Sequence, residues 1–333
     1  TGKLYSALRR LGVDYVFDTN FGADLTIMEE GYELLNRIQK GGVLPQITSC
    51  CPGWVNYCEE YYPELLENLS SAKSPMMMQG AIEKTYTAEK LGVEPKKIFS
   101  LAIMPCTAKK GEINRDGDHA SSSGYKDVDL VLTTREIARL IQRYGIKFDS
   151  IEETEADSPV GEYSGAATIF GVTGGVMEAA VRTAYAVLEG KELENVDLDV
   201  VRGLEEVKTG TVAAGGKDIR VAVVHGMANA KTLLDQVKKD KLEGKKPEYD
   251  FIEIMACRGG CVAGGGQPIG TDDDVRKERT AGLYTDDEKS VKRCSHQNPS
   301  IKKLYDEYLG QPLSEKSHHL LHTTYKEVPL YKD

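Results

Sequence analysis

Three short apolar segments of the chain each lead into a loop that carries cysteine, and this feature constrains the fold more than any other. The segments cover residues 44–48, 97–104 and 251–255, and the loops that follow carry Cys50, Cys106 and Cys257. Short apolar runs bounded by glycine or proline are typical of buried strands. Ligand sites of open α/β sheets form beyond the carboxyl ends of their strands, so we expect the three loops to converge on one site in a cleft between lobes.

The rest of the pattern alternates between strands and helices, which predicts an α/β fold. Further strands are expected at residues 15–18 and 128–133, with an antiparallel hairpin over residues 207–224 that turns at Gly215-Gly216. Apolar residues at helical spacing predict helices over residues 25–40 and 134–144, and another from Gly174-Gly175 to about residue 188. The polar, helical character of the last segment divides the chain into a main unit at 1–270 and a tail at 271–333.

The seven cysteines lie at positions 50, 51, 58, 106, 257, 261 and 294. Clustered cysteines in a chain of this length indicate metal binding or catalysis in a reducing compartment. Buried structural cysteines would explain one or two, but five lie beside glycine and proline, whose backbone can approach a cluster and donate amides to it. A zinc site fits the Cys257–Cys261 spacing, although no histidine is near the three cysteine loops in sequence. The spacing of the cysteines favours an iron–sulfur cluster over zinc but does not exclude a zinc site.

Charge and length limit the partners of the chain. Its 333 residues, of which 40% are hydrophobic and 28% charged, suit one large or two fused domains with a real core. A net charge of −10 argues against nucleic acid and anionic membranes as partners, and no apolar run approaches the roughly 20 residues that cross a bilayer. We expect a cytoplasmic protein, and the mid-domain character of the sequence at Thr1 indicates a fragment or a processed chain.

Three motifs carry a resemblance to a known family. They read TSCCPGW at 48–54, MPCTAKKGE at 104–112, and EIMACRGGC at 253–261 followed by GGGQP at 264–268. In their order and nearly every letter they are similar to the three signature motifs of iron-only (FeFe) hydrogenases. Flanking segments at 1–37, 70–75, 161–182 and 295–298 agree as well, so the resemblance covers essentially the whole chain.

The resemblance implies a two-lobed α/β fold with mainly parallel sheets flanked by helices, the active site between the lobes, and a helical C-terminal tail like a small subunit. The implied cofactor is the H-cluster, a 4Fe–4S cubane linked to a two-iron site that carries CO, cyanide and azadithiolate. Its implied cubane ligands are Cys51, Cys106, Cys257 and Cys261, with Cys261 shared with the two-iron site. Cys50 would bind no iron and would hand protons to the bridging amine, which suits a neutral thiol in a dry site.

Glu30, Glu33 and Arg37 fall on one face of a predicted helix, at spacing i, i+3, i+7. By themselves they would form a solvated face with a Glu33–Arg37 ion pair. The resemblance instead implies a proton route from the surface through Arg37, Glu33, Ser70, Glu30 and water to the unliganded thiol. Burial in such a route would raise the pKa of its carboxyl groups.

Five more residues match cofactor contacts of the family. Lys109 would donate to an iron-bound cyanide, and Met104, Met255, Pro75 and Phe170 would pack against the two-iron site. Without the resemblance, Lys109 reads as a surface lysine and the methionines as core residues.

The activity implied is the reversible reduction of protons to dihydrogen. Its partners would be ferredoxin or a similar electron carrier, maturation proteins that supply the two-iron site, and an upstream segment or subunit that carries further clusters. Two alternatives are a non-catalytic relative that acts in iron–sulfur assembly and a hydrogen sensor. Relatives of the first kind depart from the TSCCP pattern and lose the carboxylates, and sensors typically alter Cys50 or the route, whereas this chain keeps both features.

Overall fold

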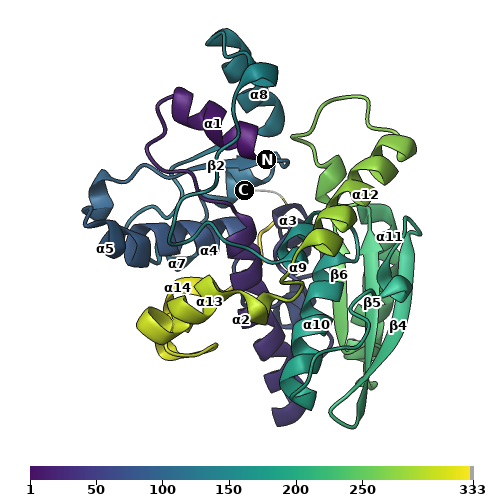
Figure 1. The fold of residues 1–333 in the computed structure, drawn as a ribbon. Helices are drawn as coiled ribbons and strands as arrows, with labels where there is room; N and C mark the ends of the chain where they lie inside the picture. Colours follow the sequence, from purple (N-terminus) through teal and green to yellow (C-terminus); the bar gives the residue numbers. More distant parts are fainter. Residues whose placement is uncertain (331–333) are drawn as a thin grey trace.

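The computed structural model describes residues 1–330 and contains two β-sheets surrounded by helices (Figure 1). The strands are β1 (Gln46–Ile47), β2 (Leu101–Met104), β3 (Leu130–Thr133), β4 (Val207–Ala214), β5 (Lys217–His225) and β6 (Phe251–Met255). The α-helices are α1 (Gly2–Arg10), α2 (Asn20–Lys40), α3 (Pro52–Tyr61), α4 (Pro75–Ile82), α5 (Ala88–Leu91), α6 (Lys109–Glu112), α7 (Asp118–Ser121), α8 (Thr134–Arg143), α9 (Gly165–Thr168), α10 (Gly175–Glu189), α11 (Met227–Leu242), α12 (Asp273–Lys289), α13 (Pro299–Leu304) and α14 (Glu315–Leu321).

The larger sheet has the strand order β1-β6-β5-β4 and the smaller pairs β2 with β3. All of these pairs are parallel except the β4–β5 hairpin, which turns at Gly215-Gly216 as predicted. Because β1 and β6 run side by side in the same direction, the loops that follow them emerge at the same edge of the sheet. The expected mainly parallel α/β fold is therefore confirmed.

Helix α2 lies between the two halves of the molecule. Its residues Ile27 and Leu34 pack into an apolar cluster with α10 and the larger sheet. Phe21 and Leu25 pack instead with α4 and the last helices of the chain. The helix ends at Gly41, whose φ of 78° gives a left-handed C-cap. Because α2 is covered on two faces, most of its residues are buried.

Most predicted elements are confirmed with small changes in their ends. Helix α2 begins five residues before the predicted start, at Asn20, because Phe21 to Asp24 are buried as well. The strand predicted at residues 15–18 is wrong. Tyr15 is 46% exposed, and the backbone amide of Val16 donates to the Asp157 carboxylate at 2.7 Å in place of a neighbouring strand. A short apolar run cannot form a strand without a partner edge.

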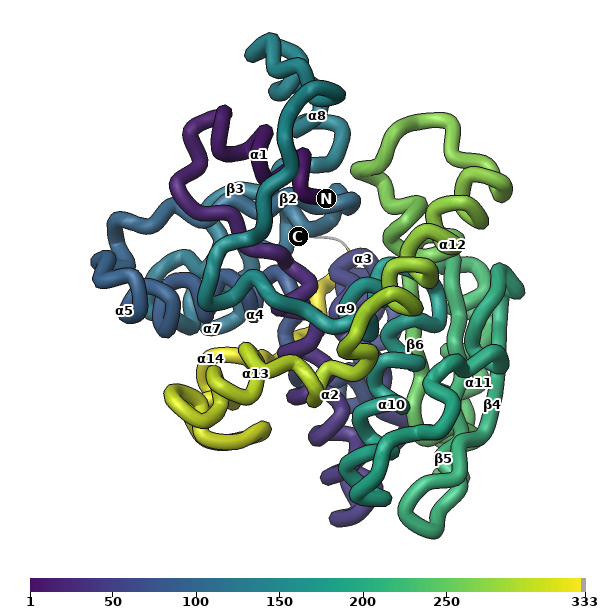
Figure 2. Tube along the Cα trace, viewed as in Figure 1, coloured from purple at the N-terminus to yellow at the C-terminus, as the bar shows by residue number. Residues whose placement is uncertain are grey.

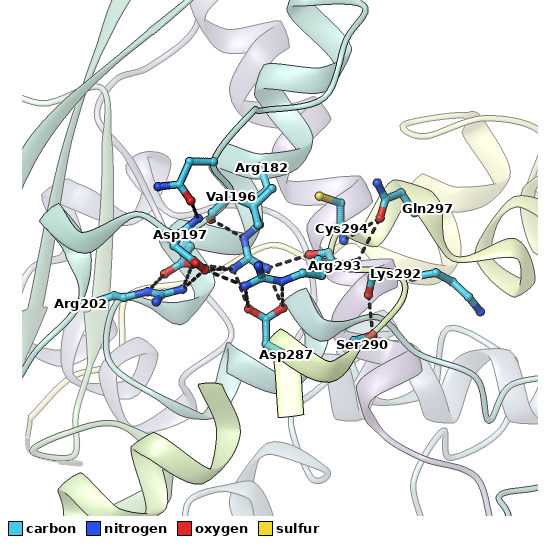
Figure 3. A network of polar contacts seen from close by, with 12 residues as sticks. Arg182, Val196, Asp197, Arg202, Asp287, Ser290, Lys292, Arg293, Cys294 and Gln297 are labelled. Carbon is cyan, nitrogen blue, oxygen red and sulfur yellow. Dashed lines mark hydrogen bonds and ion pairs between the residues drawn. The ribbon is translucent and has the colours of Figure 1, made fainter. Parts of the chain in front are cut away.

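The tail crosses both halves of the molecule, as the tube in Figure 2 shows. Helices α13 and α14 pack on α2 and α4, and α12 lies against α9. Figure 3 shows the polar network that fastens the tail to α10, in which buried Arg182 donates to both oxygens of Asp287 on α12, at 2.9 and 2.8 Å. Arg182 also donates to Glu178 on its own helix at 2.6 Å. Among residues 1–330, no helix is both long and apolar enough to cross a membrane.

Candidate active site

The three cysteine loops start at the carboxyl ends of β1, β2 and β6, as expected. Cys51 is the N-cap of α3, whose first turn begins with Pro52, where the missing amide hydrogen costs nothing. Cys106 follows β2 by two residues, and Cys257 follows β6 by two residues. Cys261 opens a 3-10 turn, Cys261–Ala263. The sequence therefore brings cysteines from both sheets toward the same region.

The glycine-rich stretch after Cys261 packs directly on the backbone of the Cys106 loop. The Gly266 amide donates to the Pro105 carbonyl at 2.8 Å. A Cβ added at Gly264 would lie 2.2 Å from the same carbonyl oxygen, and one added at Gly266 would lie 2.8 Å from the carbonyl carbon. Only glycine permits this approach, which holds the Cys106 and Cys261 loops together.

The thiols influence one another's ionisation, which places them in one neighbourhood. Burial raises the pKa of Cys261, and so do the nearby thiols of Cys51, Cys106 and Cys257. Burial also raises the pKa of Cys257, again with contributions from Cys51 and Cys106. Cys50 lies beside them, because Cys51 and Cys261 both add to the effect of burial on its pKa. The four proposed ligands and the fifth thiol are thus gathered from three loops.

Backbone amides are directed at the cysteine sulfurs. The amides of Ala256 and Trp54 face the thiol of Cys51 and oppose the effect of burial on its pKa. The amide of Gly265 does the same for Cys257. Such amide–sulfur hydrogen bonds stabilise thiolates and are the usual surroundings of iron–sulfur ligands. With four sulfur donors and no histidine among them, the residues fit an iron–sulfur cluster.

The two other cysteines are separate from this group. Cys58 and Cys294 are buried, whereas the five motif cysteines keep part of their surface accessible. Cys58 belongs to the apolar cluster around Trp54 and Leu65. A packing role for Cys58 therefore agrees with its surroundings.

Lys109 points inward toward the cysteine group. Its Nζ donates to the Cys50 carbonyl at 3.2 Å and pairs with Glu112 at 2.7 Å. Burial opposes the charged form, but Glu112 and the neighbouring thiols Cys106 and Cys50 raise the pKa of this lysine overall. Its ion pair in turn lowers the pKa of Glu112 to about 2. The site thus holds a fixed positive charge, and Lys109 is no surface residue.

Glu30 and Glu33 lie inside the molecule and not on a solvated helix face. Glu33 accepts hydrogen bonds from Ser70 Oγ at 2.7 Å and from Arg37 at 2.7 Å. Glu30 is 1% exposed, and neither of its carboxyl oxygens has a hydrogen-bond partner within residues 1–330. Burial and the charge of Glu33 raise the pKa of Glu30 to about 8. A carboxyl group with this pKa exchanges its proton near neutral pH.

Along α2, Arg37 lies on the opposite side of Glu33 from Glu30. Besides Glu33, its guanidinium donates to four backbone carbonyls, those of residues 43, 67, 68 and 69, at 2.7 to 3.3 Å. These contacts fix the side chain where α2 meets the loops around residues 43 and 68. Glu30 also raises the pKa of Cys50, so these two groups lie close together, and the order Arg37, Glu33, Ser70, Glu30 and Cys50 stays a prediction.

The remaining predicted contact residues divide between two apolar clusters. Met255 and Phe170 pack in the cluster that also contains Cys50. Met104 packs in a second cluster with Met76. Pro75 begins α4 immediately before Met76. Met255, Phe170 and Cys50 thus share one apolar cluster, while Met104 belongs to a second cluster that also holds Met76, the residue after Pro75.

Comparison with known families decides the identity of this arrangement. The family model described as iron only hydrogenase large subunit, C-terminal domain, matches residues 1–265, and the model described as iron hydrogenase small subunit matches residues 273–328. The chain belongs to the iron-only hydrogenase family. Both family parts follow one another on this single chain.

Individual relatives of the iron-only hydrogenase family agree with this assignment. Iron hydrogenase 1 of Clostridium pasteurianum is 48% identical over 332 residues, which is 98% of this chain and 57% of that protein. The chain thus spans little more than half the length of this relative. A solved structure of apo [FeFe]-hydrogenase HydA1 from Chlamydomonas reinhardtii superposes with a TM-score of 0.84 at 44% identity, covering 98% of this chain and 87% of that one. A more distant relative, cytosolic iron-sulfur assembly component 3 of Rattus norvegicus, is 31% identical over 98% of this chain and 69% of that protein.

The sequence did not point to three side chains that contact predicted site residues or their neighbours, namely Glu112, Ser71 and His322. Glu112 pairs with Lys109, and this could have been found, because the two are spaced i, i+3 within one motif. Ser71 contacts Glu33 and also His322, which is 251 residues away in sequence. No local pattern gives such a pair, because only the folding of the tail onto α2 brings it together.

Proposed function

We propose that this chain forms the catalytic unit of an iron-only hydrogenase, which reversibly reduces protons to dihydrogen at an H-cluster. Cys51, Cys106, Cys257 and Cys261 would hold the cubane, and Cys261 would be shared with the two-iron site. When bound, the cluster would pass on electrons received from a carrier and supply the iron centre at which dihydrogen forms. The proposal is supported above all by four thiols from three loops that meet beside a fifth thiol and a buried carboxyl group of raised pKa.

The chain's own residues would carry protons to the cofactor. Glu33 exchanges protons at the outer end, where Arg37 holds its carboxylate in place. Ser70 donates to Glu33 and lies close enough to Glu30 to lower the pKa of that carboxyl group, and Cys50 would be the last group of the route. A thiol suits this position, because it stays neutral when buried and can both give and take a proton.

Lys109 would bind the anionic part of the two-iron site. Its charge is fixed by Glu112 and directed toward the Cys50 loop. Met255 and Phe170 would keep water away from the same region, since both belong to the apolar cluster that Cys50 packs against. Met104 and Pro75 would close it from the side of the smaller sheet.

We further propose ferredoxin or a similar carrier as the electron donor, and maturation proteins as the source of the two-iron site. The decisive experiment loads the chain anaerobically with the cubane and the two-iron site. Infrared bands of iron-bound CO and cyanide are expected, together with hydrogen evolution from reduced ferredoxin. Absence of these bands after cubane loading would refute the proposal and favour a role like that of the assembly relatives.

Replacement of Cys50 separates the catalytic role from cofactor binding. Cys50→Ser should keep the infrared bands and the iron content but lower turnover at least about a hundredfold, because serine is a far weaker acid than a thiol. Cys58→Ser is the matched control, since Cys58 is buried in a different cluster. Bands without turnover in the unsubstituted chain would indicate a hydrogen sensor.

A further inference from the structure

A row of hydrogen bonds connects the tail to the carboxylates of α2. His322, directly after α14, lies 2.8 Å from Ser71 Oγ through its Nδ1 and 2.9 Å from Glu29 through its Nε2. Ser71 Oγ also lies 3.2 Å from Oε1 of Glu33. His322 and Glu29 are buried, at 3% and 0% exposure. A histidine contributed by the tail is thus one hydroxyl group away from the Glu33 carboxylate.

The environment of Glu29 fixes which nitrogen of His322 carries hydrogen. Glu29 accepts hydrogen bonds from Tyr305 at 2.5 Å, from the Leu313 amide at 2.9 Å and from Ser317 at 3.3 Å. A carboxylate held in this way can only accept, so Nε2 of His322 carries a hydrogen and donates it to Glu29. The protonation of His322 therefore concerns Nδ1, the atom that faces Ser71.

Ser71 has one hydroxyl hydrogen and two acceptors. When His322 is neutral, Nδ1 is an acceptor and competes with Glu33 for that hydrogen. When His322 is cationic, Nδ1 donates to the Ser71 oxygen, and the hydroxyl is free to donate to Glu33. Glu33 keeps the Ser70 and Arg37 hydrogen bonds in both cases. The charge of His322 thus decides whether Glu33 receives one more hydrogen bond.

We propose that His322 is a positioning residue of the proton route, whose protonation state is relayed through the Ser71 hydroxyl to the Glu33 carboxylate. This inference rests on the proposed function, and it gives the tail a part in proton transfer. His322 itself would not carry the protons to the cofactor, since both of its nitrogens are engaged within the protein.

Other titratable groups surround this row, and the cavity that His322 borders is also lined by Glu59, Arg115, Asp118, His119 and Glu315. His318 stacks on the His322 ring with a centroid distance of 4.7 Å and an interplanar angle of 1°. It is exposed and borders, with His322, a cavity of about 1020 Å³ that gives solvent protons a way to this ring pair. From α2 the facing groups are Glu29, Glu33 and, behind Glu33, Arg37.

The test measures both titrating groups without relying on activity. ¹⁵N-histidine NMR follows the Nδ1 of His322, and infrared difference spectra follow the carboxyl band of Glu33, identified by its loss in Glu33→Gln. We expect the Glu33 band to titrate in two steps, one of which coincides with the His322 midpoint. Ser71→Ala should remove that step and raise the Glu33 midpoint by about one pH unit, or tenfold in proton affinity, because the ionised form loses a donor.

Combined variants separate this relay from a structural effect. Ser71→Thr keeps the hydroxyl and should restore the two-step titration. His322→Ala should remove the step as well, and the Ser71→Ala/His322→Ala double variant should match Ser71→Ala alone. His319→Ala, an exposed neighbour on α14, should behave like the unsubstituted protein. Thermal unfolding checks that each variant folds, and His322→Gln replaces His322→Ala if the latter does not.

Two results would overturn the inference: a single-step Glu33 titration in the unsubstituted protein, or equal behaviour of Ser71→Ala and Ser71→Thr. In the loaded protein the pH profile of hydrogen evolution should lose the His322 step in both alanine variants. Failure of the infrared CO and cyanide bands would count against the proposed function alone, because the two titrations are measured on the protein's own side chains.

Discussion

Replacing Glu30 by glutamine should stabilise the protein at neutral pH. Glu30 is fully buried, its oxygens have no hydrogen-bond partner within residues 1–330, and its pKa is raised from 4.5 to about 8. The folded protein therefore keeps the proton of Glu30 at pH 7, while the unfolded chain releases it. Ionisation thus favours the unfolded chain, and Glu30→Gln removes this effect.

The size of the effect follows from the pKa shift. Each pKa unit corresponds to about 1.4 kcal/mol, and pH 7 lies 2.5 units above the ordinary pKa of 4.5, so the expected stabilisation is about 3 kcal/mol. Below pH 4.5 both states hold the proton and the difference vanishes. It grows as pH rises from 4.5 to about 8 and is constant above that, where both states are ionised.

Urea unfolding under anaerobic, reducing conditions at several pH values measures this difference. The free energies of unfolding of the two proteins should agree near pH 4.5 and diverge up to pH 8. Glu89→Gln is the control, because Glu89 is exposed and its replacement should leave the two curves parallel. Parallel curves for Glu30→Gln as well would show that the raised pKa, and with it the argument for proton exchange at this residue, is mistaken.

Two further predictions concern the tail and the cysteine loops. Arg182→Met should lower the free energy of unfolding by about 2–3 kcal/mol, measured by urea titration, because the buried carboxylates of Glu178 and Asp287 would lose the arginine they share and keep only Arg202 and Arg293, respectively. Gly264→Ala should greatly lower the iron content after cluster loading, measured by absorbance and metal analysis, since its Cβ would lie 2.2 Å from the Pro105 carbonyl oxygen.

Each of these predictions has a matched control. Lys231→Met breaks an exposed ion pair with Asp235 and should change stability by less than about 1 kcal/mol. Gly111→Ala places a Cβ where no atom lies within 4 Å, on helix α6 within the second cysteine motif, and should load iron normally. Equal effects of Arg182→Met and Lys231→Met, or normal iron loading of Gly264→Ala, would contradict the reasoning.

Much of the fold could be read from the sequence because it depends on local patterns. The β4–β5 hairpin has two glycines at its turn, and four of the five residues of β6 are apolar, so both appear where they were predicted. The run at residues 15–18 looks the same locally but has no strand beside it. Whether a short apolar run becomes a strand depends on a partner edge, which local sequence does not contain.

The sequence by itself also determined the family, because the cysteine motifs are its signature, and the glycines beside them allow close packing of the loops. Only the tertiary structure decided which carboxylates are buried. Glu30 and Glu33 have the spacing of an exposed helix face, and they are buried because α2 has packing partners on both sides. The pairing of His322 with Ser71 and Glu29 was likewise decided by the docking of the tail, since burial and long-range contacts are properties of the whole fold.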